Sequence, residues 1–250
     1  VSTVFGRMEI PRYLSGIVAG SATESNIIGY VAAFDIPEVV RGINAFTLGV
    51  RSVNPEAEVH VTYTNTWFDP PRERTIAQAL LDQGADVIAQ HQDSTEPQKA
   101  ARDTDTLSIG YHSDMSRFVG ESVLTSPVWT WEEKYTEIVQ QVLDGSYQSE
   151  SYYGVEVVKL APFSSLVESE SSILVEAQDA AIRAGTADVF CGPILSNTGV
   201  LVVAEGKCLT DAELLSMDWY VEGVVGDAPA QAKEGLGESS NKIPAWKISE

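Results

Sequence analysis

Short apolar runs alternate with amphipathic segments along residues 27–112, and this alternation restricts the fold more than any other feature of the sequence. The strand-like runs are IIGYVAAF (27–34), which is bounded by turn signals, EVHVTYTNTW (58–67), which is rich in β-branched residues, DVIAQH (86–91) and LSIGYH (107–112). The segments between them are IPEVVRGINAFTLGVRSVNP, DPPRERTIAQALLDQG and TEPQKAARD. These segments have the pattern of helices, and Asp69 is placed to cap the second one. Strands alternating with helices predict βαβ units, and therefore an α/β fold with a parallel sheet flanked by helices.

The predicted strand ends carry the candidate site. In parallel α/β sheets, ligands bind beyond the carboxyl ends of the strands. Those ends are Phe34-Asp35, Asn65-Thr66-Trp67, His91-Gln92-Asp93 and Tyr111-His112-Ser113-Asp114. Two of the three histidines of the chain therefore lie in matching His-x-Asp triplets, on strands that we expect to be neighbours. The third, His60, lies inside a strand and is expected to be structural.

Three kinds of site are open to these triplets. A zinc or iron site needs about three ligands, but His-x-Asp pairs at strand ends often diverge, and neither triplet belongs to a known metal motif. Acid–base catalysis is possible in principle, but the sequence has no nucleophile elbow and no glycine-rich phosphate loop. Ligand recognition is favoured, because flat rings stack on flat ligands while His and Asp contact hydrogen-bonding edges. The aromatic residues near the strand ends are Phe34, Trp67, Phe68, Tyr111, Trp129 and Trp131. We therefore expect no catalysis, no metal and no cofactor.

The charge and hydropathy of the chain exclude other classes. The net charge is −20, from 36 acidic and 16 basic residues. Nucleic acid is thus a poor partner, since binding phosphates needs clustered Lys and Arg. No apolar run reaches the roughly 20 residues of a membrane span. The chain opens VSTVFGRMEI without an initiator Met, which predicts that an upstream part has been removed or that the chain is a fragment.

The remaining segments extend the same pattern. Helices are predicted in MEIPRYLSGIVAGSATES, WEEKYTEIVQQVLDGSY and ESSILVEAQDAAIRAGT, and a strand in YGVEVVKLAPF. VFCGPILSNTGVLVVAEGKC reads as a hairpin turning at 197–199, in which a simple register puts Cys191 opposite roughly residue 205. A disulfide to Cys208 is possible, but two separate thiols are favoured. Thr210 and Glu213 form a capping box, and 227–250 is predicted to be a loosely held tail.

The sequence resembles the BMP (basic membrane protein) family, whose members are substrate-binding lipoproteins of ABC importers related to purine-nucleoside-binding proteins. The resemblance runs over about residues 4–226 through TNTWFDPPRERTIAQALLDQGADVIAQHQDS, IGYHSDMS, LTSPVWTW and VFCGPI, among other motifs. It implies a type I periplasmic-binding-protein fold, in which two lobes of parallel sheet flanked by helices close on a ligand. It also implies that the N-terminal part of lobe one is missing. Residues 1–21 would end lobe one's first pass, 26–122 form lobe two, and 123–226 cross between the lobes.

The resemblance also assigns roles to residues. The family implies a purine-like ligand. His112 occupies a position at which nucleoside-binding relatives have an Asp, and this departure leaves open whether the ligand is a purine nucleoside, a purine base or another heteroaromatic molecule. The implied ligand-binding residues are Phe34, Asp35, Trp67, His91, Asp93, Gly110, His112, Asp114 and Trp129.

The resemblance implies an ABC permease as partner and a lipid-anchored location outside the cytoplasm. The fragment is also predicted to pair with a second copy. The alternatives are a metal-dependent hydrolase using His91, Asp93, His112 and Asp114, and a cytoplasmic ligand sensor.

Overall fold

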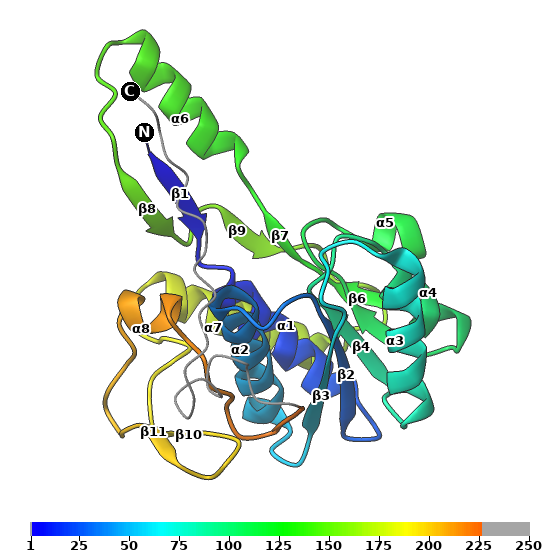
Figure 1. The fold of residues 1–250 in the computed structure, drawn as a ribbon. Coiled ribbons are helices and arrows are strands. Elements are labelled where there is room, and N and C mark those ends of the chain that lie inside the picture. Colours follow the sequence, from blue (N-terminus) through cyan, green and yellow to red (C-terminus); the bar gives the residue numbers. More distant parts are fainter. Residues whose placement is uncertain (1, 227–250) are drawn as a thin grey trace, which may run out of the picture.

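The computed structural model describes residues 2–226 of the chain, so the prediction of a loose tail at 227–250 lies outside the described residues. Its centre is a six-stranded sheet in the order β12-β3-β2-β4-β5-β6, with every neighbouring pair parallel (Figure 1). The strands are β2 (Ile27–Ala32), β3 (Glu58–Tyr63), β4 (Val87–Gln90), β5 (Leu107–Ile109), β6 (Val123–Thr125) and β12 (Val224–Val225). The predicted parallel sheet and its four strands are confirmed, although β3 and β5 end earlier than their apolar runs.

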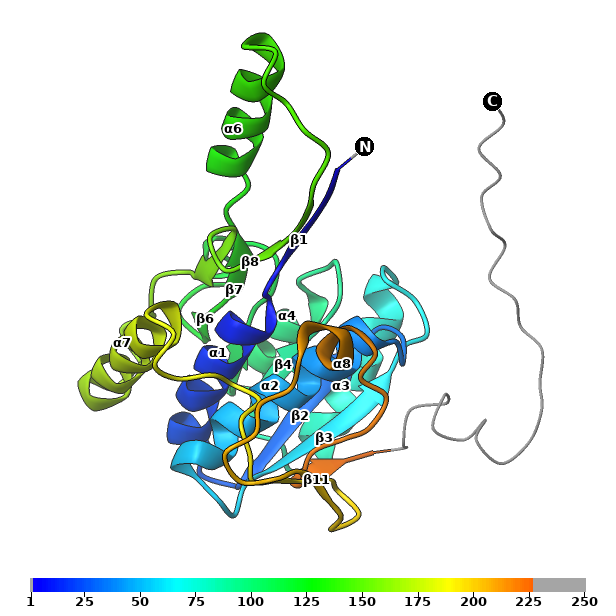
Figure 2. The same cartoon turned by 90° about the vertical axis from the view of Figure 1, so that its left-hand side faces the viewer.

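Helices cover both faces of this sheet, as Figures 1 and 2 show. The helices that follow the strands are α2 (Pro37–Val53), α3 (Pro70–Asp82), α4 (Glu96–Asp103) and the short α5 (Ser116–Val119). Alternate residues of β2 point to opposite faces. Tyr30 therefore packs in one core with α1 (Glu9–Ala22) and α2, while Val31 packs in another with α3 and α4. The predicted cap of α3 is confirmed, since Asp69 accepts a hydrogen bond from the backbone N–H of Arg72 at 3.2 Å. No helix in this part of the chain has the length and apolar character needed to span a bilayer.

Glycines set the spacing of α1 and α2. A Cβ built on Gly16 would lie 2.1 Å from the Phe46 carbonyl oxygen, and one on Gly49 would lie 1.9 Å from the Tyr13 carbonyl oxygen. Only glycine lets two helix backbones approach this closely. The close contact brings the first turn of α1 under the ends of β4 and β5, where Arg12 donates to the Gln90 carbonyl.

A second group of elements lies on the far side of β7 (Pro127–Trp129) and β9 (Val158–Leu160) from the main sheet (Figure 1). β7 pairs antiparallel with β9, and β1 (Thr3–Gly6) pairs parallel with β8 (Ser151–Gly154). The helix α6 (Glu132–Leu143) extends away from the rest of the molecule, while α7 (Ser169–Arg183) packs against α1 (Figure 2). The boundaries of the two lobes stay a prediction.

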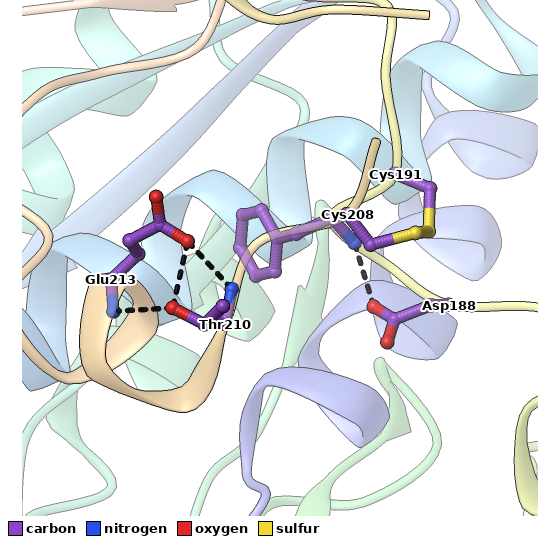
Figure 3. The surroundings of a disulfide bond; sticks show 6 residues. Asp188, Cys191, Cys208, Thr210 and Glu213 are labelled. Atoms are coloured by element: carbon purple, nitrogen blue, oxygen red, sulfur yellow. Dashed lines mark hydrogen bonds between the residues drawn. A yellow bond between two sulfur atoms is a disulfide. The ribbon is translucent and has the colours of Figure 1, made fainter. Parts of the chain in front are cut away.

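The predicted hairpin is present, but the prediction of two separate thiols is wrong. The strands β10 (Ile194–Leu195) and β11 (Leu201–Val203) pair antiparallel with a register shift between Ile194 and Leu195. Outside these strands Gly192 faces Glu205, and Cys191 faces Cys208 rather than residue 205. The two sulfur atoms form a disulfide (Figure 3). The register assumed for a regular hairpin failed because irregular pairing places extra residues on the returning strand.

The same region confirms the predicted capping box. The Thr210 hydroxyl accepts from the Glu213 backbone N–H, and the Glu213 carboxylate accepts from the Thr210 N–H and hydroxyl at 2.7 Å (Figure 3). This box begins the short helix α8 (Asp211–Leu215), which places Leu214 against α2. The disulfide and the box together fix the segment that returns the chain to β12.

Removing the disulfide is expected to lower the free energy of unfolding by about 3 kcal/mol, because it closes a loop of 17 residues. The double variant Cys191→Ser/Cys208→Ser should therefore unfold at lower urea concentration than the wild type. A reducing agent should reproduce the loss in the wild type and do nothing to the double variant. Two free thiols, titrated in unreduced and denatured wild-type protein, would contradict the bond.

Candidate functional site

The strand order places the site at a topological switch point. From β2 the chain passes to β3 on one side, and β4 then lies on the other side of β2. Helices on the two sides of such a reversal diverge, which leaves a crevice beyond the carboxyl ends of the strands. Phe34 follows β2, Trp67 follows β3 and His91 follows β4. All three side chains therefore start at the edge where α/β sheets bind their ligands.

Five predicted residues form one continuous row of rings. The ring centroids of Phe34 and Trp67 are 5.2 Å apart, and those of Trp67 and His91 are 6.0 Å apart. His91 and His112 follow at 6.5 Å, and His112 and Trp129 at 6.4 Å. At the Phe34 end of the row, 38% of Trp67 is exposed. The row thus offers ring faces and edges along the ends of β2, β3, β4 and β5.

The row continues beyond the predicted residues. Trp129 stacks on Trp131 with centroids 4.9 Å apart, and Trp131 stacks on Tyr135 of α6 at 5.6 Å. The Trp129 ring also lies against β1, since a Cβ on Gly6 would be 2.5 Å from Trp129 Cζ3. The site is therefore in direct contact with the segments that connect the two parts of the molecule.

His112 is the polar centre of the site. Its Nδ1 accepts from Trp129 Nε1–H at 2.8 Å, so its Nε2 carries the proton and donates to Asp93 Oδ1 at 3.2 Å. Its backbone has φ = 64°, in the left-handed region that few residues other than glycine adopt. Although 40% of its side chain is exposed, partial burial among the rings lowers the pKa of His112 to about 4; Asp93 opposes this shift and the charge of Arg12 adds to it. His112 is thus a neutral imidazole with both nitrogens engaged.

His91 lies deeper in the site. Only 3% of the residue is exposed, and its ring centroid is 4.5 Å from that of Tyr111. Burial holds the pKa of His91 well below its usual value, with further lowering by Arg12, His112 and Arg41. Nδ1 of His91 has no hydrogen-bond partner within residues 2–226. His91 is therefore a neutral wall residue rather than a charged one.

Three predicted residues are placed differently. Asp114 accepts from Ser116 Oγ at 2.6 Å and from Arg117 Nε at 3.1 Å, at the start of α5. A Cβ on Gly110 would lie 2.2 Å from Ser126 Oγ, so Gly110 permits close packing. Asp35 is half-buried and is one of the groups, after burial and Tyr220, that raise the pKa of Tyr63. Their contacts with a ligand stay predictions.

The predicted histidine–aspartate quartet does not assemble. Across the described range 2–226, no group of three His, Cys, Asp or Glu side chains has the geometry to hold a metal ion. His112 and Asp93 are paired, but His91 turns its ring toward Tyr111 and Asp114 is bound to Arg117. The geometry does not support the hydrolase alternative.

Arg12 lies at the site, although the sequence pattern did not predict it there. This residue in the first turn of α1 is fully buried, and its guanidinium lies 3.7 Å from the centroid of the Tyr111 ring. A signal was present, because Arg12 and Glu9 are charged residues on the buried side of a helix whose other buried residues are apolar or small. Arginine is almost never fully buried unless it is paired, so the burial of Arg12 beneath the site indicates a functional role.

Comparison with known proteins agrees with the fold and identifies the family. The sequence profile of the Bmp family, described as ABC transporter substrate-binding protein PnrA-like, matches residues 1–184. A protein of Haloferax volcanii that is named as an ABC transporter glucose-binding protein is 42% identical over 90% of this chain and 56% of its own length. A purine-binding protein of Brucella abortus is 38% identical over 87% of this chain and 63% of its own length.

These relatives are longer than the region that the chain matches, since it spans 56% and 63% of their lengths. Among solved structures, an ABC transporter solute-binding protein from Aeropyrum pernix superposes with a TM-score of 0.65, at 18% identity, over 74% of this chain and 65% of its own. That likeness confirms the type I periplasmic-binding-protein-like α/β fold. The chain belongs to the Bmp family of ABC transporter substrate-binding proteins.

Proposed function

We propose that this protein binds a purine nucleoside or a purine-base-like ligand in the cleft between two lobes and delivers it to an ABC permease outside the cytoplasm. The observation that carries the proposal is the row of rings from Phe34 to Trp129 along the switch point. Flat heteroaromatic ligands stack on such rings. The Brucella relative named as purine-binding adds weaker support.

Asp93 and His112 form the polar rim of the site, and their hydrogen-bonding groups determine which groups of the ligand can face them. The carboxylate of Asp93 is 46% exposed and accepts from His112 through one oxygen only. Both nitrogens of His112 are already engaged. The pair therefore offers acceptors and no free donor, so the ligand should bring an N–H or O–H group, such as an exocyclic amine or a ribose hydroxyl.

The proposal includes a mechanism of transport without covalent chemistry. A ligand that contacts both lobes favours the closed clamp, and the closed clamp is what a permease recognises. Trp129 is placed to transmit occupancy, since it contacts His112 on one side and Gly6 of β1 on the other. Lipid anchoring and pairing of two copies stay predictions.

Calorimetric titration of the full-length protein tests the ligand class. The panel is adenine, hypoxanthine, adenosine, guanosine, inosine and glucose, the last because a pyranose also stacks on tryptophan. Saturable binding of at least one purine, tighter than glucose, is expected. Binding of glucose alone, or of nothing in the panel, would remove the purine proposal while leaving the family unchanged.

Trp67→Ala is expected to weaken purine binding. Stacking of a base on an aromatic side chain contributes about 1–3 kcal/mol, so Kd should rise about 5- to 150-fold. His60→Ala is the matched control, because His60 lies on β3, the strand that precedes Trp67, but pairs with Glu58 away from the row. Equal loss of affinity in both variants would argue against a ligand on Trp67.

A further inference from the structure

Arg12 is a buried cation directly beneath the candidate site. Its Nη1 donates to the Gln90 carbonyl oxygen at 2.6 Å, and its guanidinium lies 3.7 Å from the Tyr111 centroid and 5.6 Å from that of Tyr30. Nε and Nη2 have no hydrogen-bond partner in the described part of the chain. Such a charge acts strongly on its surroundings, since little water screens it.

The nearby acids are occupied or do not pair with Arg12. Glu9 binds Arg41 at 3.3 Å and accepts from the Tyr153 hydroxyl at 2.6 Å. Glu38 of α2 lies within electrostatic range of Arg12 and Arg41, yet burial raises its pKa, which weakens it as a counter-charge. The positive field of Arg12 is therefore directed at the rings above it.

Both site histidines lie within that field. A Cβ on Gly42 would be 3.6 Å from His91 Nδ1 and 3.7 Å from Arg12 Nε, so these two nitrogens border the same small space. Tyr111, over which Arg12 lies, has its ring centroid 3.8 Å from that of His112. Burial is the largest cause that keeps both imidazoles neutral; Arg12 adds to it at His91, together with His112 and Arg41, and at His112, where Asp93 acts in the opposite direction.

A neutral His112 is required by its hydrogen bonds. The Trp129 indole N–H can donate to Nδ1 only while that nitrogen has a free lone pair. A protonated imidazole would present a second N–H donor to Trp129. This would break the series of hydrogen bonds from Trp129 through His112 to Asp93.

We propose that Arg12 is a positioning residue of the ligand site, whose buried guanidinium adds to the effect of burial in keeping His91 and His112 as neutral imidazoles, and so helps to preserve the Trp129–His112–Asp93 hydrogen bonds in acidic surroundings. The part that concerns ligand rests on the proposed function. Arg12 thereby extends to lower pH the range over which the rim of the cleft keeps its shape.

NMR of the three labelled histidines, without ligand, tests the inference. In Arg12→Met the titration midpoints of His91 and His112 should rise by about one pH unit or more, since a neighbouring charge has been removed. Arg12→Lys retains the charge and should keep the midpoints of His91 and His112 close to those of the wild type. The His60 resonance should be the same in all three proteins and serves as the internal reference. Unchanged midpoints in a folded Arg12→Met protein would overturn the proposal.

A second measurement uses the wild type alone, in case Arg12→Met does not fold. The indole N–H resonance of Trp129, assigned with Trp129→Phe, should shift with the same midpoint as the His112 imidazole. An indole signal that stays constant while His112 titrates would show that the bond does not depend on a neutral ring. In calorimetry, the ratio of Kd at pH 5 to Kd at pH 7 should be larger for Arg12→Met than for the wild type. If no purine binds, the histidine titrations still decide the role of Arg12, so the two proposals fail separately.

Discussion

Replacing Arg41 with Met should lower the free energy of unfolding by about 3–5 kcal/mol, because it leaves a buried carboxylate without its main partner. Arg41 is 2% exposed and Glu9 3%. Arg41 Nε donates to Glu9 at 3.3 Å, and Nη1 donates to the Leu214 carbonyl at 3.0 Å, which ties α2 to α1 and α8. Arg7, 3.7 Å from Glu9, is too distant and too exposed to replace it fully. Urea denaturation followed by circular dichroism measures the loss.

Two controls distinguish the effect of leaving Glu9 without its partner from the effect of removing an arginine side chain. Arg102→Met removes an arginine that is 45% exposed and paired with Asp103 on the surface, and should cost less than about 1 kcal/mol. The double variant Glu9→Gln/Arg41→Met removes both buried charges and should regain part of the loss, since the orphaned charge is then absent. A cost for Arg41→Met no larger than that for Arg102→Met would show that the pair does not stabilise this junction.

The local part of the fold could be predicted from the sequence. The apolar run that contains Tyr30 and Val31 is bounded by turn signals, and Pro37 begins a long helical pattern, so a strand and then a helix follow from short-range rules. Once these elements alternate, a parallel sheet follows, and with it the edge on which Phe34, Trp67 and His91 stand. The strand order then decides that these residues, far apart in sequence, become neighbours.

The rest depends on contacts between distant segments. The disulfide was missed because the pairing is irregular: a register shift at Ile194 and Leu195, and the two residues between Glu205 and Cys208, bring Cys208 and not residue 205 opposite Cys191. Asp114 matches the pattern of Asp93, but the left-handed backbone at His112 turns the chain and α5 begins there, so Asp114 binds Arg117 instead. Arg12 lies some 80 residues before His91 in the sequence, and only the packing of α1 beneath β4 shows that it faces the site.

The close contact between α1 and α2 predicts a second large loss of stability. Gly49→Ala should lower the free energy of unfolding by more than about 3 kcal/mol, beyond the usual cost of overpacking. The new Cβ would lie 1.9 Å from the Tyr13 carbonyl oxygen and 3.1 Å from Gly16 Cα, and backbone atoms cannot rotate away as a side chain can. The helices must separate, which also draws the first turn of α1, and with it Arg12, away from the ends of β4 and β5.

Gly42→Ala is the matched control on the same helix. Its Cβ would meet His91 Nδ1 at 3.6 Å and Arg12 Nε at 3.7 Å, which are ordinary contact distances. Because alanine favours a helix over glycine by about 1 kcal/mol, this variant should be as stable as the wild type or slightly more stable. Comparing the two variants by urea denaturation therefore separates steric exclusion from helix propensity. If Gly49→Ala were as stable as Gly42→Ala, the two helices would not be in the close contact that places Arg12 beneath the histidines.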